Sequence, residues 1–261
     1  MKLHHLLPGI FVFPALLSGA QASSQVNIGD DDANQGMYNG GWNDGTGGDN
    51  GFFAWKMVAT SDGEGSFAGH YVAKKGEHAE VEPITTDRAF ALFANGKSFE
   101  ESVAFRGISV PLEAGDNFSF DLRRGPFEQK GDLDDPAPSE VGVTYRTGNA
   151  NESLADVATG ARLRFFARED SPNYLITDAE TEFDTGISIA QEALALTLTM
   201  VDADTYDLEV INLSDNSIKL MEGRKFGGLA GAPINSVALF NHNSEAHDFY
   251  FNHFQLMRNA P

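Results

Sequence analysis

The arginines of this sequence gather in its middle third, within a chain that is strongly acidic overall. The 261 residues include 18 Lys and Arg against 38 Asp and Glu, a formal net charge of −20. Alternation along the predicted strands places several arginines on polar strand faces. They are Arg123, Arg146, Arg162, Arg164 and Arg168. If their strands are neighbours, these guanidinium groups predict a face that binds the carboxylates or sulfates of an acidic polysaccharide. The alternative is that Asp and Glu on adjacent strands already pair with them.

A second group of residues, beside these arginines, suggests catalysis. Tyr145 and Arg146 adjoin each other, and His253 lies near the end of the chain. In a polysaccharide lyase an arginine neutralises the uronate while a tyrosine or histidine accepts a proton, so these three residues are the candidate lyase set. A glycoside hydrolase instead needs paired carboxylates about 5–10 Å apart. We favour a binding protein, with a lyase as the first alternative, a glycoside hydrolase as the second and a matrix or surface structural protein as the third.

A glycine-rich segment, residues 36–51, contains one of the two tryptophans. The segment does not match a phosphate-binding loop, because no Gly-Lys-Ser/Thr follows it. Trp42 is either a stacking platform for a sugar ring or a plug at the edge of the core, since large aromatic side chains are mostly buried. We take Trp42 as a candidate ligand-binding residue and keep the plug as the alternative.

The elements that must position these residues are strands. Residues 194–200, 206–210 and 117–122 alternate apolar and polar side chains with a period of two, which is typical of strands with one buried face. Clusters of Gly, Asn, Asp and Ser separate this run of short segments. No stretch of 12 residues sustains a helical periodicity. The sequence therefore predicts an all-β protein, an antiparallel β-sandwich.

Composition and the N-terminus restrict the environment of the protein. The chain has no cysteine, which excludes disulfides, thiolate zinc sites and cysteine nucleophiles. Its net charge disfavours nucleic acid and anionic membranes as partners. Residues 1–22 contain Lys2, an apolar stretch over 6–17 and a small-x-small ending at Ala22, the pattern of a secretory signal peptide. We expect residues 23–261 to be one domain, secreted to the extracellular space or the periplasm.

Several segments resemble secreted bacterial β-sandwich proteins with concanavalin A-like or laminin-G-like jelly rolls. The segments are Tyr38-Asn39-Gly40-Gly41-Trp42, residues 47–52 with Trp55, residues 88–96, residues 117–121 and Asp204-Thr205-Tyr206. The resemblance implies a jelly-roll fold and an extracellular glycan as the ligand class, because this fold carries many carbohydrate-binding proteins. We therefore predict a secreted protein that binds an anionic polysaccharide.

The same resemblance implies a structural calcium ion, which in carbohydrate-binding jelly rolls often ties the first strand to the last. Asp30 and Asp32 near the first predicted strand and Asp248 before the last are the candidate ligands in this chain. Calcium prefers several oxygen ligands, which carboxylates in loops provide. The alternative is a solvated acidic surface.

Overall fold

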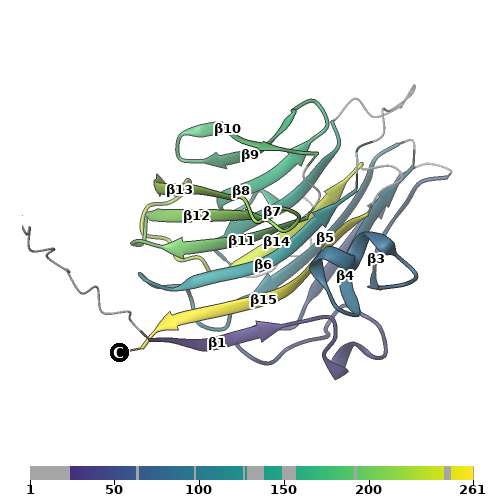
Figure 1. Cartoon of the computed structure of the whole chain (residues 1–261), viewed down its shortest axis with the longest axis horizontal. Coiled ribbons are helices and arrows are strands. Elements are labelled where there is room, and N and C mark those ends of the chain that lie inside the picture. Colours follow the sequence, from purple (N-terminus) through teal and green to yellow (C-terminus); the bar gives the residue numbers. More distant parts are fainter. Residues whose placement is uncertain are drawn as a thin grey trace, which may run out of the picture.

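The computed structural model describes residues 24–62, 65–96, 98–125, 127, 138–148, 157–190, 193–243 and 248–260. The predicted signal peptide, residues 1–22, lies outside the described residues. Two antiparallel sheets pack face to face (Figure 1), and the chain crosses repeatedly from one sheet to the other, as in a jelly roll. The prediction of an all-β, antiparallel β-sandwich is confirmed. Within the described residues, no helix is long and apolar enough to cross a membrane.

In the described residues, one sheet has eight strands. Its order is β13 (Ile218–Lys225), β12 (Thr205–Asn212), β11 (Ala193–Met200), β6 (Asn117–Arg124), β15 (Phe249–Asn259), β4 (Arg88–Asn95) and β3 (Phe67–Lys74). The remaining strand, β1 (Gln25–Asp31), pairs with the C-terminal half of β15. The first and last strands therefore lie side by side, with the end of β15 next to the start of β1 (Figure 1).

The other sheet, as described, has seven strands. Its order is β10 (Thr181–Ser188), β9 (Asn173–Asp178), β8 (Ala161–Arg168), β7 (Glu140–Arg146), β14 (Ser236–His242), β5 (Glu100–Gly107) and β2 (Lys56–Ser61). Two short 3-10 segments, η1 (Gly36–Tyr38) and η2 (Ala79–Ile84), complete the described secondary structure. The small side chains of β3 and β4 let η2 lie close to the eight-stranded sheet, where Val81 and Ile84 are buried against Ala73, Ala89 and Ala91.

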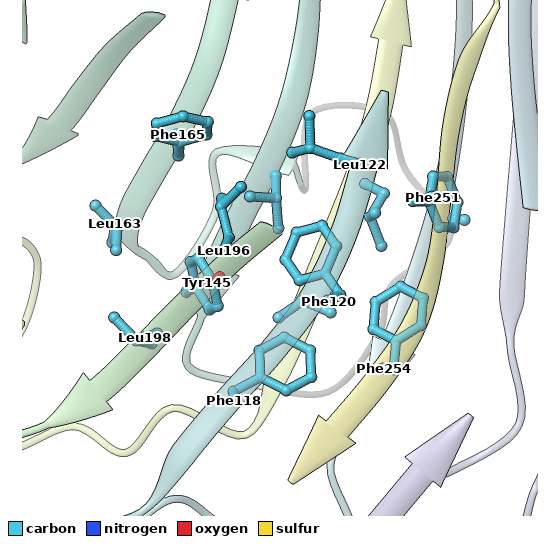
Figure 2. Close-up of a cluster of buried hydrophobic side chains, with 14 of the residues drawn as sticks. Phe118, Phe120, Leu122, Tyr145, Leu163, Phe165, Leu196, Leu198, Phe251 and Phe254 are labelled. Carbon is cyan, nitrogen blue, oxygen red and sulfur yellow. The ribbon is translucent and has the colours of Figure 1, made fainter. Parts of the chain in front are cut away.

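The core between the sheets follows from the period-2 alternation. On β6 and β11 the Phe, Leu and Met side chains point inward, and Phe118 lies opposite Leu198 while Phe120 lies opposite Leu196. Figure 2 shows the side chains of the seven-stranded sheet, including Tyr145 and Phe165, packing against them. Full burial of one such side chain stabilises the fold by about 1.5–3 kcal/mol. The alternation therefore accounts for both the strands and the packing of one sheet on the other.

Candidate functional site

The five predicted arginines do not form one face. Arg123 is on β6, in the eight-stranded sheet, and its guanidinium donates to the backbone carbonyl of Glu80. The other four are on β7 and β8, which are neighbours in the seven-stranded sheet. The expected adjacency of the strands is therefore correct for β7 and β8 and wrong for β6, which lies between β11 and β15.

Arg146 and Arg162 are buried rather than open to a ligand. Arg146 donates from Nε and Nη2 to the carbonyl oxygen of Thr159, at 3.0 and 2.8 Å. Arg162 donates to the carbonyl oxygen of Ala203 at 3.1 Å and to Asp204 Oδ1 at 2.8 Å. A buried guanidinium requires such partners, because an unpaired buried charge is costly. These two arginines anchor the loops that contact them. The prediction that they bind a ligand is therefore wrong.

Arg164 and Arg168 are half-buried on the face of the seven-stranded sheet that points away from the other sheet, called here the outer face. Arg164 Nη2 lies 3.0 Å from Glu140 Oε2, and Arg168 Nη1 lies 4.0 Å from Glu140 Oε1. Arg168 also pairs with Glu182 at 2.7 Å and with Asp170 at 2.6 Å. These two arginines are therefore paired with carboxylates, the alternative to an open arginine face.

The candidate lyase residues lie in three separate places. Tyr145 is fully buried between the sheets (Figure 2), with its ring edge-on to Phe118 at 5.7 Å. Burial raises the pKa of its hydroxyl far above the usual value for tyrosine. Arg146 follows Tyr145 in β7 and points to the opposite face, whereas His253 belongs to β15 in the other sheet. The expected lyase set is not assembled, because adjacent residues of a strand face opposite sides.

Trp42 is a core residue and not a surface platform. Its side chain is 2 % exposed and packs edge-on against Trp55 at 5.1 Å and Phe251 at 5.6 Å. The glycine-rich segment carries the indole into the core, which makes the plug the correct interpretation. The prediction of Trp42 as a sugar-stacking residue is corrected accordingly.

The predicted calcium ligands are not brought together either. Asp30 pairs in register with Gln255 of β15 and accepts a hydrogen bond from Gln35 at 2.8 Å. Asp32 accepts from the backbone and side-chain nitrogens of Asn34, both at 2.7 Å. Asp248 accepts from the Tyr71 hydroxyl, and its place before β15 puts it roughly 20 Å along the strand from Gln255. Within the described residues, no group of three or more His, Asp or Glu side chains is arranged to hold a metal ion.

The outer face carries a row of titratable residues that the sequence analysis only partly identified. Glu101 of β5 and Glu140 of β7 both lie opposite His242 of the intervening strand β14, and Glu140 also lies opposite Arg168. Glu101 is half-buried, and its carboxyl has no hydrogen-bond partner among the described residues. Burial and the charge of Glu140 raise the pKa of Glu101 to about 7, while Arg164 opposes the shift. Glu101 was not identified from the sequence. Its spacing from Val103 and Phe105 places all three side chains on one face of the strand, which is the signal that could have identified it.

Two aromatic rings lie beside the Arg164 guanidinium on the outer face. The guanidinium carbon of Arg164 lies 4.6 Å from the ring centroid of Phe166 and 5.1 Å from that of Phe240. Gly142 lies opposite both rings in the pairing of β7 with β8 and β14. A Cβ at Gly142 would come within 2.4 Å of the Phe165 carbonyl oxygen and 2.6 Å of Phe166 Cβ. Glycine thus permits the close packing of the two rings beside which Arg164 pairs with Glu140.

Comparison with known proteins gives only a loose similarity. No protein-family model matches the chain, and no curated protein matches it either. Solved structures that resemble it include the potassium-bound carbohydrate recognition domain of Emp46p, with 12% identity over 77% of this chain and 87% of that one, at a TM-score of 0.41.

Two other solved structures have a similar degree of likeness. Lectin II from Ulex europaeus has 10% identity over 78% of this chain and 98% of that one, at a TM-score of 0.40. The exoplasmic/lumenal domain of VIP36 in its Ca2+/Man3GlcNAc-bound form has 9% identity over 79% and 84%, at 0.44. Similarity at these values identifies no residue of a binding site.

Proposed function

We propose that the protein binds carbohydrate on the outer face, at a strip formed by Glu101, Glu140, Arg164 and Arg168. The observation that carries the proposal is the Arg164 guanidinium, held against two aromatic rings and paired with Glu140 at 3.0 Å. Sugar hydroxyls donate and accept hydrogen bonds, and they are recognised by a few polar groups whose orientation is fixed in advance. The packing on Phe166 and Phe240 supplies that fixed orientation.

The ligand we propose is a neutral glycan rather than an acidic one. Arg168 is paired with Glu182 and Asp170, and Arg164 is paired with Glu140. The strip therefore offers no surplus of positive charge to a uronate or sulfate, in a chain whose net charge is −20. This revises the anionic polysaccharide of the sequence-based hypothesis. Secretion remains part of the proposal and rests on the pattern of residues 1–22, and the structural calcium ion stays a prediction.

Affinity electrophoresis in gels that contain neutral β-glucan, xylan or mannan tests the proposal, with polygalacturonate as the acidic comparison. We expect one neutral gel to retard the protein and the Arg164→Ala variant to lose that retardation. Arg123→Ala is the matched control, because it removes the same charge from the other sheet. Migration unchanged in every neutral gel, or equal weakening by both variants, would overturn the proposal.

One observation favours a second candidate function, glycoside hydrolysis. Glu101 and Glu140 are separated by a single strand, so their Cα atoms are about 10 Å apart, and their environments differ. Two carboxyls in contrasting environments are how glycosidases divide the roles of acid and base. Glu101, with its raised pKa, would protonate the glycosidic oxygen as the C–O bond breaks, and Glu140 would take a proton from the attacking water.

Release of reducing ends from the bound glycan distinguishes the two functions. A hydrolase releases them, and Glu101→Gln abolishes the release. Retardation by the wild-type protein without any release leaves the binding function standing and removes the hydrolase.

A further inference from the structure

A pocket at one end of the sandwich is separate from the outer face. Its volume is about 380 Å³, within the range of small-molecule sites. Three chain segments line it: the connection from β5 to β6, the turn from β11 to β12, and the connection from β13 to β14. The lining residues are Pro111, Leu112, Glu113, Ala114, Met200, Asp202, Ala203, Gly231 and Pro233.

The pocket has an apolar interior. Leu112 and Met200 belong to the hydrophobic core, so the floor is continuous with the space between the sheets. The three segments that form the pocket also contain large apolar side chains that are exposed. Val110 and Val201 are each 46 % exposed and Leu229 is 75 % exposed. A concave surface with an apolar lining is typical of a ligand-binding site.

The walls of the pocket are held by hydrogen bonds that cross between its three segments. The Leu112 amide donates to the carbonyl of Ile234 at 3.0 Å, and the Gly115 amide donates to that of Met200 at 2.7 Å. The Gly231 amide donates to Asp204 Oδ1 at 2.7 Å, the same oxygen that the buried Arg162 contacts. The pocket is therefore preformed, which lowers the entropic cost of binding a ligand.

The charged groups of the pocket are carboxylates. Glu113 and Asp202 are in the lining, and no lining residue is cationic. The pKa of Asp202 is lowered by hydrogen bonds from the Asp204 amide and the Thr205 hydroxyl, so its charge is retained. Two cations lie nearby. Arg258 makes its short contact with Asp116 at 2.6 Å and a longer one with Glu113 at 3.9 Å. Lys225 donates to Thr205 at 2.5 Å and contributes to the lowered pKa of Asp202.

We propose that this end-loop pocket binds a small organic cation, an amine or quaternary ammonium group attached to an apolar body. The apolar body would lie against Leu112, Met200 and Pro233, and the cation would face Glu113 and Asp202 at the mouth. An apolar lining with few polar groups suits a sugar poorly, because the hydroxyls of the sugar would lose their hydrogen bonds to water. The two carboxylates of the lining disfavour a small apolar anion.

Isothermal titration calorimetry of the full chain with phenethylamine tests the proposal, with 2-phenylethanol and 3-phenylpropionate as the neutral and anionic counterparts. We expect the amine to bind most tightly and its affinity to fall with added salt. Glu113→Gln should weaken binding about two- to fivefold, as expected for one exposed charge. Glu77→Gln, which removes the same charge beside β3, should leave the affinity unchanged.

Ala114→Phe provides a steric test, because the ring enters the pocket from an exposed position and should weaken amine binding more than about tenfold. Circular dichroism shows whether this variant is folded. If it is not folded, the Glu113→Gln variant still tests the proposal. Absence of amine binding at millimolar concentration, or equal binding of the amine and the alcohol, would overturn the proposal. Wild-type affinity in a folded Ala114→Phe variant would place the amine elsewhere and overturn it as well.

Discussion

Arg106 and Asp31 form an ion pair inside the core, with Nη2 and Oδ2 2.6 Å apart and both side chains 1 % exposed. The pair joins β5 of one sheet to β1 of the other. Tyr38 and Trp55 also donate to the Asp31 carboxylate, at 2.7 and 3.0 Å, and the Trp55 ring lies 4.7 Å from the guanidinium carbon. The network ties the segment before β2, through Tyr38 and Trp55, to the core.

Asp31→Asn should destabilise the protein by about 3–5 kcal/mol, because it leaves the Arg106 guanidinium buried without a counter-charge. Urea unfolding followed by fluorescence measures the change. Glu77→Gln, which breaks an exposed pair with Lys74, is the control and should change stability by less than about 0.5 kcal/mol. Similar losses of unfolding free energy in the two variants would show that the buried ion pair contributes no more than the exposed one.

Tyr145→Phe should stabilise the protein. The Tyr145 hydroxyl is buried without a hydrogen-bond partner, and leaving such a group unsatisfied costs about 1–3 kcal/mol. Removal of the oxygen keeps the ring and its contact with Phe118, so the melting temperature should rise by a few degrees. A clear fall in melting temperature would mean that the hydroxyl has a partner in the folded protein.

Gly47→Ala should destabilise much more than Gly223→Ala. Both glycines have positive φ, +74° and +64°, so both substitutions carry the same backbone strain of about 1–2 kcal/mol. A Cβ at Gly47 would lie 2.2 Å from the Tyr38 hydroxyl and 3.0 Å from Arg106 Nη1, whereas a Cβ at Gly223 meets nothing within 4 Å. The difference between the two unfolding free energies isolates the steric contact, and equal losses would contradict it.

His253 should make the stability depend on pH. Its Nδ1 lies 2.7 Å from Asp121 and its Nε2 lies 3.3 Å from Asp32, which raises its pKa above 6.5, mainly through the hydrogen bond to Asp121. The folded state therefore binds the proton more tightly than the unfolded state. The stabilisation is complete below pH 6.5 and is lost as the pH rises through the folded-state pKa.

His253→Asn tests this dependence, because asparagine tolerates the φ of +57° at this position. We expect the variant to lose more stability at pH 5.5 than at pH 8.5. An equal loss at both values would show that the protonated imidazole contributes nothing.

Glu101 should add a second pH dependence of the same sign, at lower pH. Its carboxyl has a pKa raised to about 7 by burial and by Glu140, so folding favours the protonated form. Stability should therefore fall between the unfolded pKa, near 4.5, and pH 7, and this fall should be smaller in Glu101→Gln, which lacks the titrating carboxyl. Denaturant titrations at pH 5 and pH 8 measure the difference, and parallel behaviour of wild type and variant would contradict it.

Much of the fold was predictable from local pattern. The alternation at 117–122 and 194–200 predicts strands with the correct inward side chains, because period-2 burial is a property of the strand itself. The same alternation places Tyr145 and Arg146 on opposite faces of their strand, so it already argued against the lyase set. Trp42 was ambiguous, since a tryptophan in a loop follows no periodicity.

The sequence alone determined an acidic, cysteine-free β-sandwich and the buried face of the strands with clear alternation. The tertiary structure alone decided that Arg123 is on a different sheet from Arg164, that Arg146 and Arg162 are sealed by loops, and that Glu101 and Glu140 flank one strand. The reason is physical: alternation depends on neighbouring residues, whereas sheet order and the pairing of charges depend on contacts between residues far apart in the chain. The charge of −20 is thus an average, and local pairing determines what each surface can bind.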